Sequence, residues 1–233
     1  MNDFFDAIDF IFSERESPAG GSQVGGLGEL WELMWPHLKL SGLSMLIACA
    51  LAIPLALWLG HRGRGGFLAI NASNVGRAVP SLALIAFFVA WLGIGYANLT
   101  LALVLLAIPP ILTNTYTGVR QVDRDSVDSA RGMGMTGPQI VRRVELPLAL
   151  PLMFGGIRTS AVNVVATATI APLAGVTTLG DPIINVNTYG DEGRLAAAIV
   201  VALLAVATEV LLGTAQRAVT PRGLKVNRRE AVS

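Results

Sequence analysis

The stretch Asp128–Pro147 reads DSARGMGMTGPQIVRRVELP and lies between two long apolar runs of the chain. It contains Gly132, Gly134 and Gly137 together with several acidic and basic side chains. The protein as a whole has 233 residues and is 53% hydrophobic. A polar, glycine-rich segment in such a chain must lie in water. The apolar runs on either side of it decide where in the protein this aqueous segment lies.

The composition indicates an integral membrane protein. Charged residues make up 14% of the chain, against about 25% in soluble domains. The mean hydropathy is +0.60. The net charge of +1 gives no general affinity for nucleic acid, and the single cysteine, Cys49, excludes an internal disulfide.

Five apolar windows are long enough to cross a bilayer, which takes about 20 residues as a helix. We therefore expect an all-α membrane protein with about five transmembrane helices. The windows are Leu40–Gly60, Ala78–Gly95, Leu99–Val119, Leu148–Ala174 and Leu195–Thr214.

The basic residues predict the orientation of these spans, because lysine and arginine gather on the cytoplasmic side. With the N-terminus outside, thirteen of the 17 basic residues lie in the cytoplasm, and Arg15, Lys39 and Arg194 lie outside. Residues 1–36 then form an extracytoplasmic segment, 37–220 the transmembrane domain and 221–233 a cytoplasmic tail. The opening stretch faces the cytoplasm.

Three segments that are placed outside have distinct predicted structures. Residues 17–28, SPAGGSQVGGLG, have the composition of a flexible linker. The acidic, aromatic N-terminus before it is too short to span and is expected to lie along the outer interface. The loop 176–193 carries no basic residue before Gly193, and we expect it to fold back into the membrane or to receive an external partner.

The opening stretch predicts two short helices at the membrane surface. Asp125-Ser126 can cap the first helix, and Gly132 and Gly134 can end it, since glycine takes the left-handed conformation at little cost. The sequence Thr136-Gly137-Pro138 starts the second helix, and Leu146-Pro147 stops it. Exposed apolar contacts ringed by arginines would suit docking to another protein; they are Met133, Met135 and Ile140, with Arg131, Arg142 and Arg143 around them.

The spacing in this stretch resembles the EAA loop of ABC-importer permeases. That pattern is Glu-Ala-Ala, three residues, Gly, nine residues, Ile, one residue, Leu-Pro. The matching positions here are Asp128, Ser129, Ala130, Gly134, Val144, Leu146 and Pro147. Asp replaces Glu and Ser replaces the first Ala of the triplet, which shortens the reach of the acidic side chain.

The resemblance covers about residues 38–225 and extends to the permeases of osmoprotectant importers. It is carried by NVGRAVPSLAL (74–84), LAIPPILTNTYTGVR (106–120), ARGMGMTGPQ (130–139) and VELPLALPL (144–152). It implies a type I ABC-importer fold in a bacterial cell membrane and a solute such as glycine betaine, carnitine or choline. It also implies a coupling helix, which includes Arg131 and Met135, seated on an ATPase.

The resemblance further implies the partners. These are the ATPase subunit, an extracytoplasmic solute-binding protein and a second permease, either a copy or a paralogue. The chain has no G-x-x-x-x-G-K-[ST] phosphate loop, so ATP must be bound and hydrolysed by the separate subunit. We expect no cofactor, no metal and no enzymatic activity in this chain. His37 and His61 flank the first span, and we expect both to be interfacial and too isolated for a metal site.

Polar residues within the spans are the candidates for the translocation path. Arg158 lies about ten residues into the fourth span, where a charge must face protein or water. Glu209 in the fifth span is its candidate partner, either as a structural salt bridge or as part of a gate or cavity lining. Asn114 and Asn163 could line a path or hydrogen-bond between helices.

Three alternatives stand beside the osmoprotectant hypothesis. The first is an ABC permease for another small polar solute such as an amino acid. The second is a membrane-embedded enzyme, which requires catalytic groups clustered at one depth, whereas the spans hold only Arg158 and Glu209 as charged groups. The third is an ion channel, which leaves the docking stretch without a role.

The predicted orientation can be tested by cysteine accessibility in a Cys49→Ala background. Single cysteines at Ser22 and Asn187 should react with an impermeant reagent added to intact cells, because both positions are placed outside. Cysteines at Ser126 and Ser233 should react only after the cells are opened. The reverse pattern would contradict both the topology and the cytoplasmic position of the docking stretch.

Overall fold

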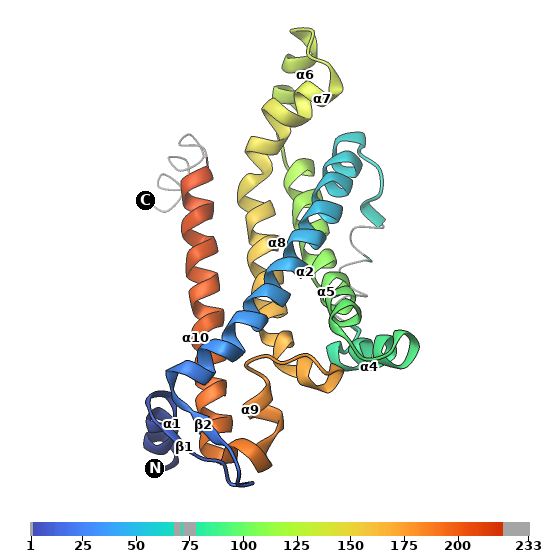
Figure 1. Cartoon of the computed structure of the whole chain (residues 1–233). Coiled ribbons are helices and arrows are strands. Elements are labelled where there is room, and N and C mark those ends of the chain that lie inside the picture. The colour runs from blue at the N-terminus through green and yellow to red at the C-terminus, as the bar shows by residue number, and fades with distance from the viewer. Residues whose placement is uncertain (1, 68–70, 72–77, 221–233) are drawn as a thin grey trace. The chain divides into compact units, whose positions relative to one another are not determined.

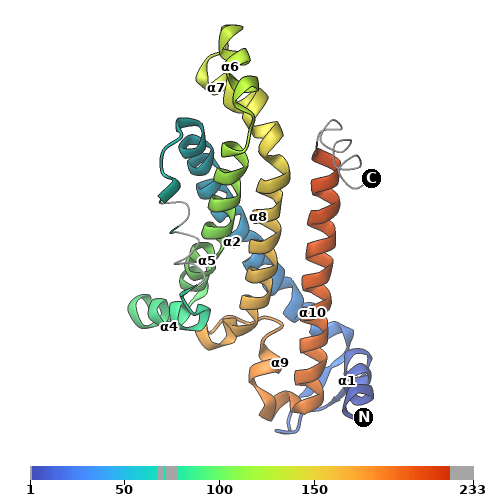
Figure 2. The same ribbon diagram turned by 180° about the vertical axis from the view of Figure 1, so that it is seen from behind.

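The computed structural model describes residues 2–67, 71 and 78–220 (Figures 1 and 2). Arg77 and the predicted tail 221–233 lie outside the described residues. The elements in chain order are α1 Asn2–Phe12, β1 Glu14–Glu16, β2 Gln23–Gly25, α2 Gly26–Arg62, α4 Ser81–Leu92, α5 Tyr96–Arg120, α6 Arg124–Gly132, α7 Gly137–Ile140, the π-helix η1 Val141–Glu145, α8 Leu146–Thr167, the 3-10 helix η2 Ala168–Ala174, α9 Asp181–Ile184 and α10 Val186–Val219.

The expected all-α membrane fold is confirmed, with one difference in the spans. Among the described residues, four helical stretches are long and apolar enough to cross a membrane, namely Gly26–Arg62, Tyr96–Arg120, Gly137–Ala174 and Val186–Val219. The window predicted at 78–95 holds α4, which has 12 residues and ends at Gly93 with φ of 85°. That helix is shorter than the roughly 20 residues that a crossing needs.

Large apolar side chains project from the long helices into the surroundings. Leu46 and Leu51 of α2 are 70% and 56% exposed, and Leu203 and Leu211 of α10 are 63% and 67% exposed. Exposed apolar surface on this scale is unfavourable in water. It costs nothing against lipid tails, so these helix faces fit a hydrocarbon environment.

The chain forms two compact units. The first comprises Met1–Leu46, Val79–Leu106 and Ala161–Thr208, and the second Ile47–Ala78, Ala107–Ser160 and Glu209–Ser233. Each of the helices α2, α5, α8 and α10 contributes residues to both units. Each unit has buried apolar clusters of its own.

The N-terminal segment of the first unit is folded against the start of α10. Phe10 of α1 is fully buried in a cluster with Ala7, Val24 and Ala196. A Cβ at Gly193 would lie 2.8 Å from the Phe10 ring, so only glycine leaves room for this ring. Figures 1 and 2 both show α1 and the β-hairpin beside α10.

The prediction of a flexible linker at 17–28 is wrong, because these residues form the turn after β1, strand β2 and the start of α2. Strands β1 and β2 pair antiparallel, with Arg15 opposite Val24. Their connection is closed by Ser17, whose N–H donates to Ser22 O at 2.9 Å. The Ser17 hydroxyl also donates to Thr188 O at 2.7 Å, which ties the hairpin to α10. These tertiary contacts outweigh the glycine-rich composition on which the prediction rested.

The outer loop of the first unit is compact. Thr178 is fully buried and donates from Oγ1 to Ala168 O of η2 at 3.0 Å. The Thr178 N–H donates to the half-buried Asp181 carboxylate at 2.7 Å, and burial raises the pKa of Asp181. The predicted outer loop 176–193 therefore contains a hydrogen-bonded turn, the short helix α9 and the first turns of α10.

Close helix packing in the second unit agrees with the small residues of α8. A Cβ at Gly156 would lie 2.6 Å from Pro110 O and 2.8 Å from Asn114 Cβ, so glycine sets the approach of α8 to α5. The Ser160 hydroxyl donates to Ala107 O at 2.8 Å across the same contact. Steric fit and an inter-helix hydrogen bond thus join these two helices.

Gly180 provides a test of the outer turn. A Cβ at this position would overlap the carbonyl oxygen of Thr169, so Gly180→Ala must displace the backbone. We expect a loss of about 1–3 kcal/mol or more, as for other overpacked sites. Gly42→Ala in α2 is the matched control, because a Cβ there meets nothing within 4 Å. Thermal unfolding in detergent should separate the two variants, and equal midpoints would contradict the packing of this turn.

Candidate functional site

The opening stretch does begin with a capped helix, but the cap is earlier than predicted. Asp123, and not Asp125-Ser126, is the N-cap of α6. Its Oδ2 accepts the N–H and the hydroxyl of Ser126 at 3.0 and 2.9 Å, and these bonds lower the pKa of Asp123. The pattern D-x-x-S satisfies a free N–H of the first turn, which is the signal that would have placed the cap correctly.

Gly134 ends α6 as expected. Its φ is +81°, in the left-handed region that side-chain-bearing residues rarely adopt. The N–H of Gly134 donates to Arg131 O, and the N–H of Met135 donates to Ala130 O at 3.1 Å. These bonds satisfy the last carbonyls of the helix and reverse the chain. A Cβ at Gly134 would meet nothing within 4 Å, so the backbone conformation alone requires glycine there.

The second helix starts as predicted but does not stop at Leu146-Pro147. Thr136 is the N-cap of α7, and its N–H donates to Gln139 Oε1 at 2.8 Å. The chain then widens into η1 and continues without a break into α8. A proline ring clashes with the carbonyl four residues earlier in a regular α-helix. The wider π-turn immediately before Pro147 relieves this clash, which is why the helix continues.

The two short helices share a small core. Val122, Val127, Ala130 and Ile140 are buried together, with Met135 and Val144 packed against them. Met133 is the only one of the three predicted apolar contacts that is exposed to a large degree, at 72%. The predicted exposure of Ile140 is wrong, since it closes this core.

The exposed tip of the segment is polar around Met133. Asp128 and Arg131 form an exposed ion pair at 3.4 Å. Ser129 and Gly134 are exposed beside them, whereas Ala130 faces inward. We call five of the exposed residues the docking tip: Asp128, Ser129, Arg131, Met133 and Gly134. Figure 1 shows α6 and α7 at the end of α8.

A hydrogen bond to a buried carboxylate joins this segment to α2. His61 Nδ1 lies 2.8 Å from Glu145 Oε2, and the Glu145 side chain is 6% exposed. A Cβ at Gly137 would lie 3.2 Å from His61 Nε2, so the ring sits between α7 and η1. The expected interfacial His61 thus has a specific partner, and the sequence pattern gives no sign of this contact across 84 positions. The same expectation is wrong for His37, which is fully buried with Nε2 3.0 Å from Val165 O.

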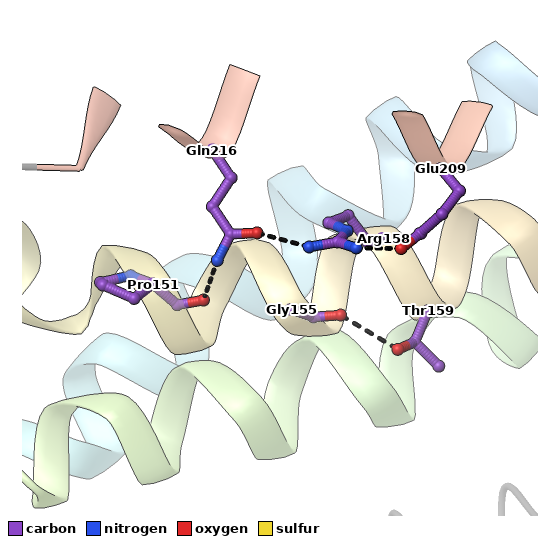
Figure 3. A network of polar contacts seen from close by, with 6 residues as sticks. All are labelled: Pro151, Gly155, Arg158, Thr159, Glu209 and Gln216. Carbon is purple, nitrogen blue, oxygen red and sulfur yellow. Dashed lines mark hydrogen bonds and ion pairs between the residues drawn. The ribbon is translucent and has the colours of Figure 1, made fainter. Parts of the chain in front are cut away.

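Arg158 and Glu209 are brought together as expected. Arg158 donates from Nη2 to Glu209 Oε1 and from Nη1 to Gln216 Oε1, the latter at 2.8 Å (Figure 3). Gln216 also donates to Pro151 O at 2.9 Å. The result is a polar network between α8 and α10. Gln216 was missed, although its seven-residue spacing from Glu209 places both on one face of α10.

The network faces an open cleft of about 1330 Å³ within the second unit. The cleft lining includes Arg158, Glu209, Gln216 and Arg217, and it reaches Asp123 at the base of α6. Leu148, Leu152 and Val210 contribute apolar surface. Two groups of opposite charge at the depth of a span thus border space that is large enough for a small solute.

The other two candidate path residues do not line this cleft. Asn114 donates to Pro110 O within its own helix at 2.9 Å, which is a structural contact. Asn163 is exposed on the part of α8 that belongs to the first unit. Sequence spacing alone could not separate these asparagines from the cleft-lining residues.

The Arg158–Glu209 pair generates a double-mutant prediction. Removing one partner leaves the other without its opposite charge, whereas removing both leaves no charge to satisfy. Arg158→Ala and Glu209→Ala should each lower the folded yield in detergent, and the double variant should recover part of the loss. Strictly additive losses would show that the two side chains are not energetically coupled.

Comparison with known families identifies the chain over most of its length. Residues 52–224 match the family described as "Binding-protein-dependent transport system inner membrane component". A glycine betaine/carnitine/choline transport system permease protein of Bacillus subtilis is 38% identical over 199 residues, which cover 85% of this chain and 92% of that protein. A carnitine transport permease protein of Listeria monocytogenes is 38% identical over 192 residues, covering 82% and 88%.

Solved structures show the same fold. A chain of the MetNI methionine ABC transporter in an inward-facing conformation matches with a TM-score of 0.71 at 21% identity, covering 84% of this chain and 98% of that one. An amino acid ABC transporter chain matches with a TM-score of 0.64 at 17% identity. The expected importer-permease fold is therefore confirmed, and the chain belongs to the family of inner membrane components of binding-protein-dependent transport systems.

Proposed function

We propose that this chain is the permease subunit of an ATP-driven importer for a compatible solute such as glycine betaine, carnitine or choline. The observation that carries the proposal is the 38% identity to a permease named for those three solutes, over 92% of its length. The likeness to methionine and amino acid transporters is at 21% identity or less and supports the fold alone. It gives no support to an amino acid as the solute.

The docking tip is the element that we assign to ATPase coupling. Its exposed ion pair and the exposed Met133 offer charged and adaptable apolar contacts on one short segment. Ala130, Met135 and Val144 lie behind it in the small core, where they hold the tip in shape. ATP is bound and hydrolysed by the partner subunit.

The connections of the tip suggest how movement of the ATPase reaches the membrane. The chain from α7 through η1 to α8 is one continuous helical path, since Pro147 does not break it. The His61–Glu145 pair fastens the same segment to the end of α2. A push on the tip would therefore act on two long helices at once.

The remaining partners follow from the family. An extracytoplasmic binding protein would deliver the solute to the outer side, where we place the N-terminal segment. A second permease, a copy or a paralogue, would complete the membrane part. Leu148 and Pro151 lie with Arg158 along the cleft, and we assign this cleft to the translocation path.

Reconstituted uptake tests the proposal as a whole. The purified permease with its ATPase in proteoliposomes should accumulate glycine betaine, carnitine or choline when the binding protein and ATP are present. Omitting any one of the ATPase, the binding protein or ATP should abolish uptake. If the importer took up none of the three solutes but did take up an amino acid, the proposed cargo would be refuted.

Gly134→Val tests the coupling role of the tip. Valine in the left-handed conformation costs about 1–2 kcal/mol, which is small beside the packing of the spans but large enough to change the turn. We expect normal membrane insertion, loss of ATP-dependent uptake and weaker co-purification of the ATPase. Gly132→Ala is the matched control, since Gly132 is helical and a Cβ there meets nothing within 4 Å.

Arg131→Glu perturbs the same surface by charge instead of backbone shape. Its effect on ATPase co-purification should be larger at low salt, because exposed charges are screened within about 10 Å at 0.1 M ionic strength. Full uptake and co-purification in both Gly134→Val and Arg131→Glu would show that the docking tip is not the coupling element.

A further inference from the structure

The guanidinium of Arg158 lies across one face of α10. Glu209, Gly213 and Gln216 recur there with helical spacing, and the glycine stands between the two polar residues. A Cβ at Gly213 would lie 3.6 Å from Arg158 Cζ, so the flat guanidinium rests on the backbone of α10 at this point. Figure 3 shows Arg158 reaching from α8 to both side chains.

The ion pair is open to the cleft. The Arg158 and Glu209 side chains are 32% and 41% exposed, and both belong to the cleft lining. Charged groups at the depth of a span face protein or a water-filled space, never lipid tails. The exposed part of this pair therefore borders space that water or a polar solute can enter.

Neither partner uses its full bonding capacity within the described residues. A guanidinium has five N–H donors, and Nη1 and Nη2 of Arg158 each have one recorded bond, which leaves one N–H on each for a solute. Its Nε is buried without an acceptor and does not reach the cleft. A carboxylate can accept about four hydrogen bonds, and only Oε1 of Glu209 has a recorded donor. Both side chains therefore keep hydrogen-bonding capacity that a solute in the cleft can use.

Resting on the proposed function, we propose that Arg158 and Glu209 form a subsite for zwitterionic solutes. The solute carboxylate pairs with Arg158, for which the planar guanidinium is suited. The quaternary ammonium group of the same molecule faces Glu209. One internal ion pair is replaced by two pairs with the solute, and the summed charge of the site stays at zero.

This charge balance distinguishes the solutes. Glycine betaine and carnitine carry a carboxylate as well as a quaternary ammonium group, so they can engage both residues. Choline has no carboxylate, so it would leave Arg158 paired with Glu209 or leave Arg158 with no opposite charge. The subsite therefore favours passage of the two zwitterions, and Arg158 is the residue that distinguishes them from choline.

The test compares the uptake of three labelled solutes in proteoliposomes that contain the complete importer and one binding protein at saturating solute. Because every variant uses the same binding protein, its own preference cancels when each uptake ratio is divided by that of the wild type. Arg158→Gln should lower the ratio of glycine betaine to choline, and of carnitine to choline, by about tenfold, the change expected for a loss of roughly 1.4 kcal/mol. Glu209→Gln should lower uptake of all three, because each carries the quaternary ammonium group.

Two further variants separate a solute subsite from a structural clamp. Gln216→Ala removes two hydrogen bonds between α8 and α10 but no charge, so any loss of uptake should be equal for the three solutes. Arg158→Lys keeps the positive charge for folding but loses the planar donor pair, so it should shift the ratios in the same direction as Arg158→Gln, by less. If Arg158→Gln fails to fold, the uptake ratios of Arg158→Lys alone distinguish a solute subsite from a structural clamp.

The two possible failures are distinct. Uptake ratios that match the wild type in both Arg158 variants would overturn the subsite and leave the proposed function standing. Absence of uptake of all three solutes by the wild-type importer would instead contradict the proposed function itself.

Discussion

The structure depends on the rule that a charged group inside a membrane must face protein or a water-filled space. Arg158 illustrates this, since it is held by Glu209 and Gln216, and Gln216 in turn donates to Pro151 O. A similar rule for backbone polar groups explains why η1 replaces a helix break before Pro147. A widened turn keeps the chain helical where it enters the apolar region. Charges and proline are thus accommodated by local geometry, while the apolar faces remain free for lipid.

We assign docking and transmission to different parts of the segment 123–147. Its outer surface presents the Asp128–Arg131 pair and Met133, and its inner surface is a closed apolar core. The buried Glu145 lies at the inner end, next to His61 of α2. A coupling element needs an exposed surface that binds a partner. It also needs a firm connection to the membrane helices, which here are α8 and α2. In the second unit the cleft lining also reaches from Asp123 to Arg158, so the base of α6 and the charged pair border the same space.

Periodicity, composition and turn chemistry predicted the helical membrane fold, the left-handed Gly134 and the pairing of Arg158 with Glu209. These features depend on local backbone preference or on the high cost of an unpaired charge, and both can be read from residue types. The hairpin at 14–25, the His61–Glu145 pair and the role of Gln216 could not be predicted in this way. They depend on contacts between residues far apart in the chain, such as Ser17 with Thr188 across 171 positions. The length of α4 could not be predicted from hydropathy either, because the apolar pattern does not show where the helix at 81–92 ends.

Site-directed cross-linking tests most directly whether the docking tip seats on an ATPase subunit. A photoreactive residue at the exposed Ser129 should cross-link to the ATPase in membranes that contain the assembled importer. The same residue at exposed Gly42 of α2, in the other unit, should not. We expect a product at Ser129 whose yield changes when ATP is added. Equal capture from both positions, or none from Ser129 in an importer that transports, would contradict the coupling role of the tip.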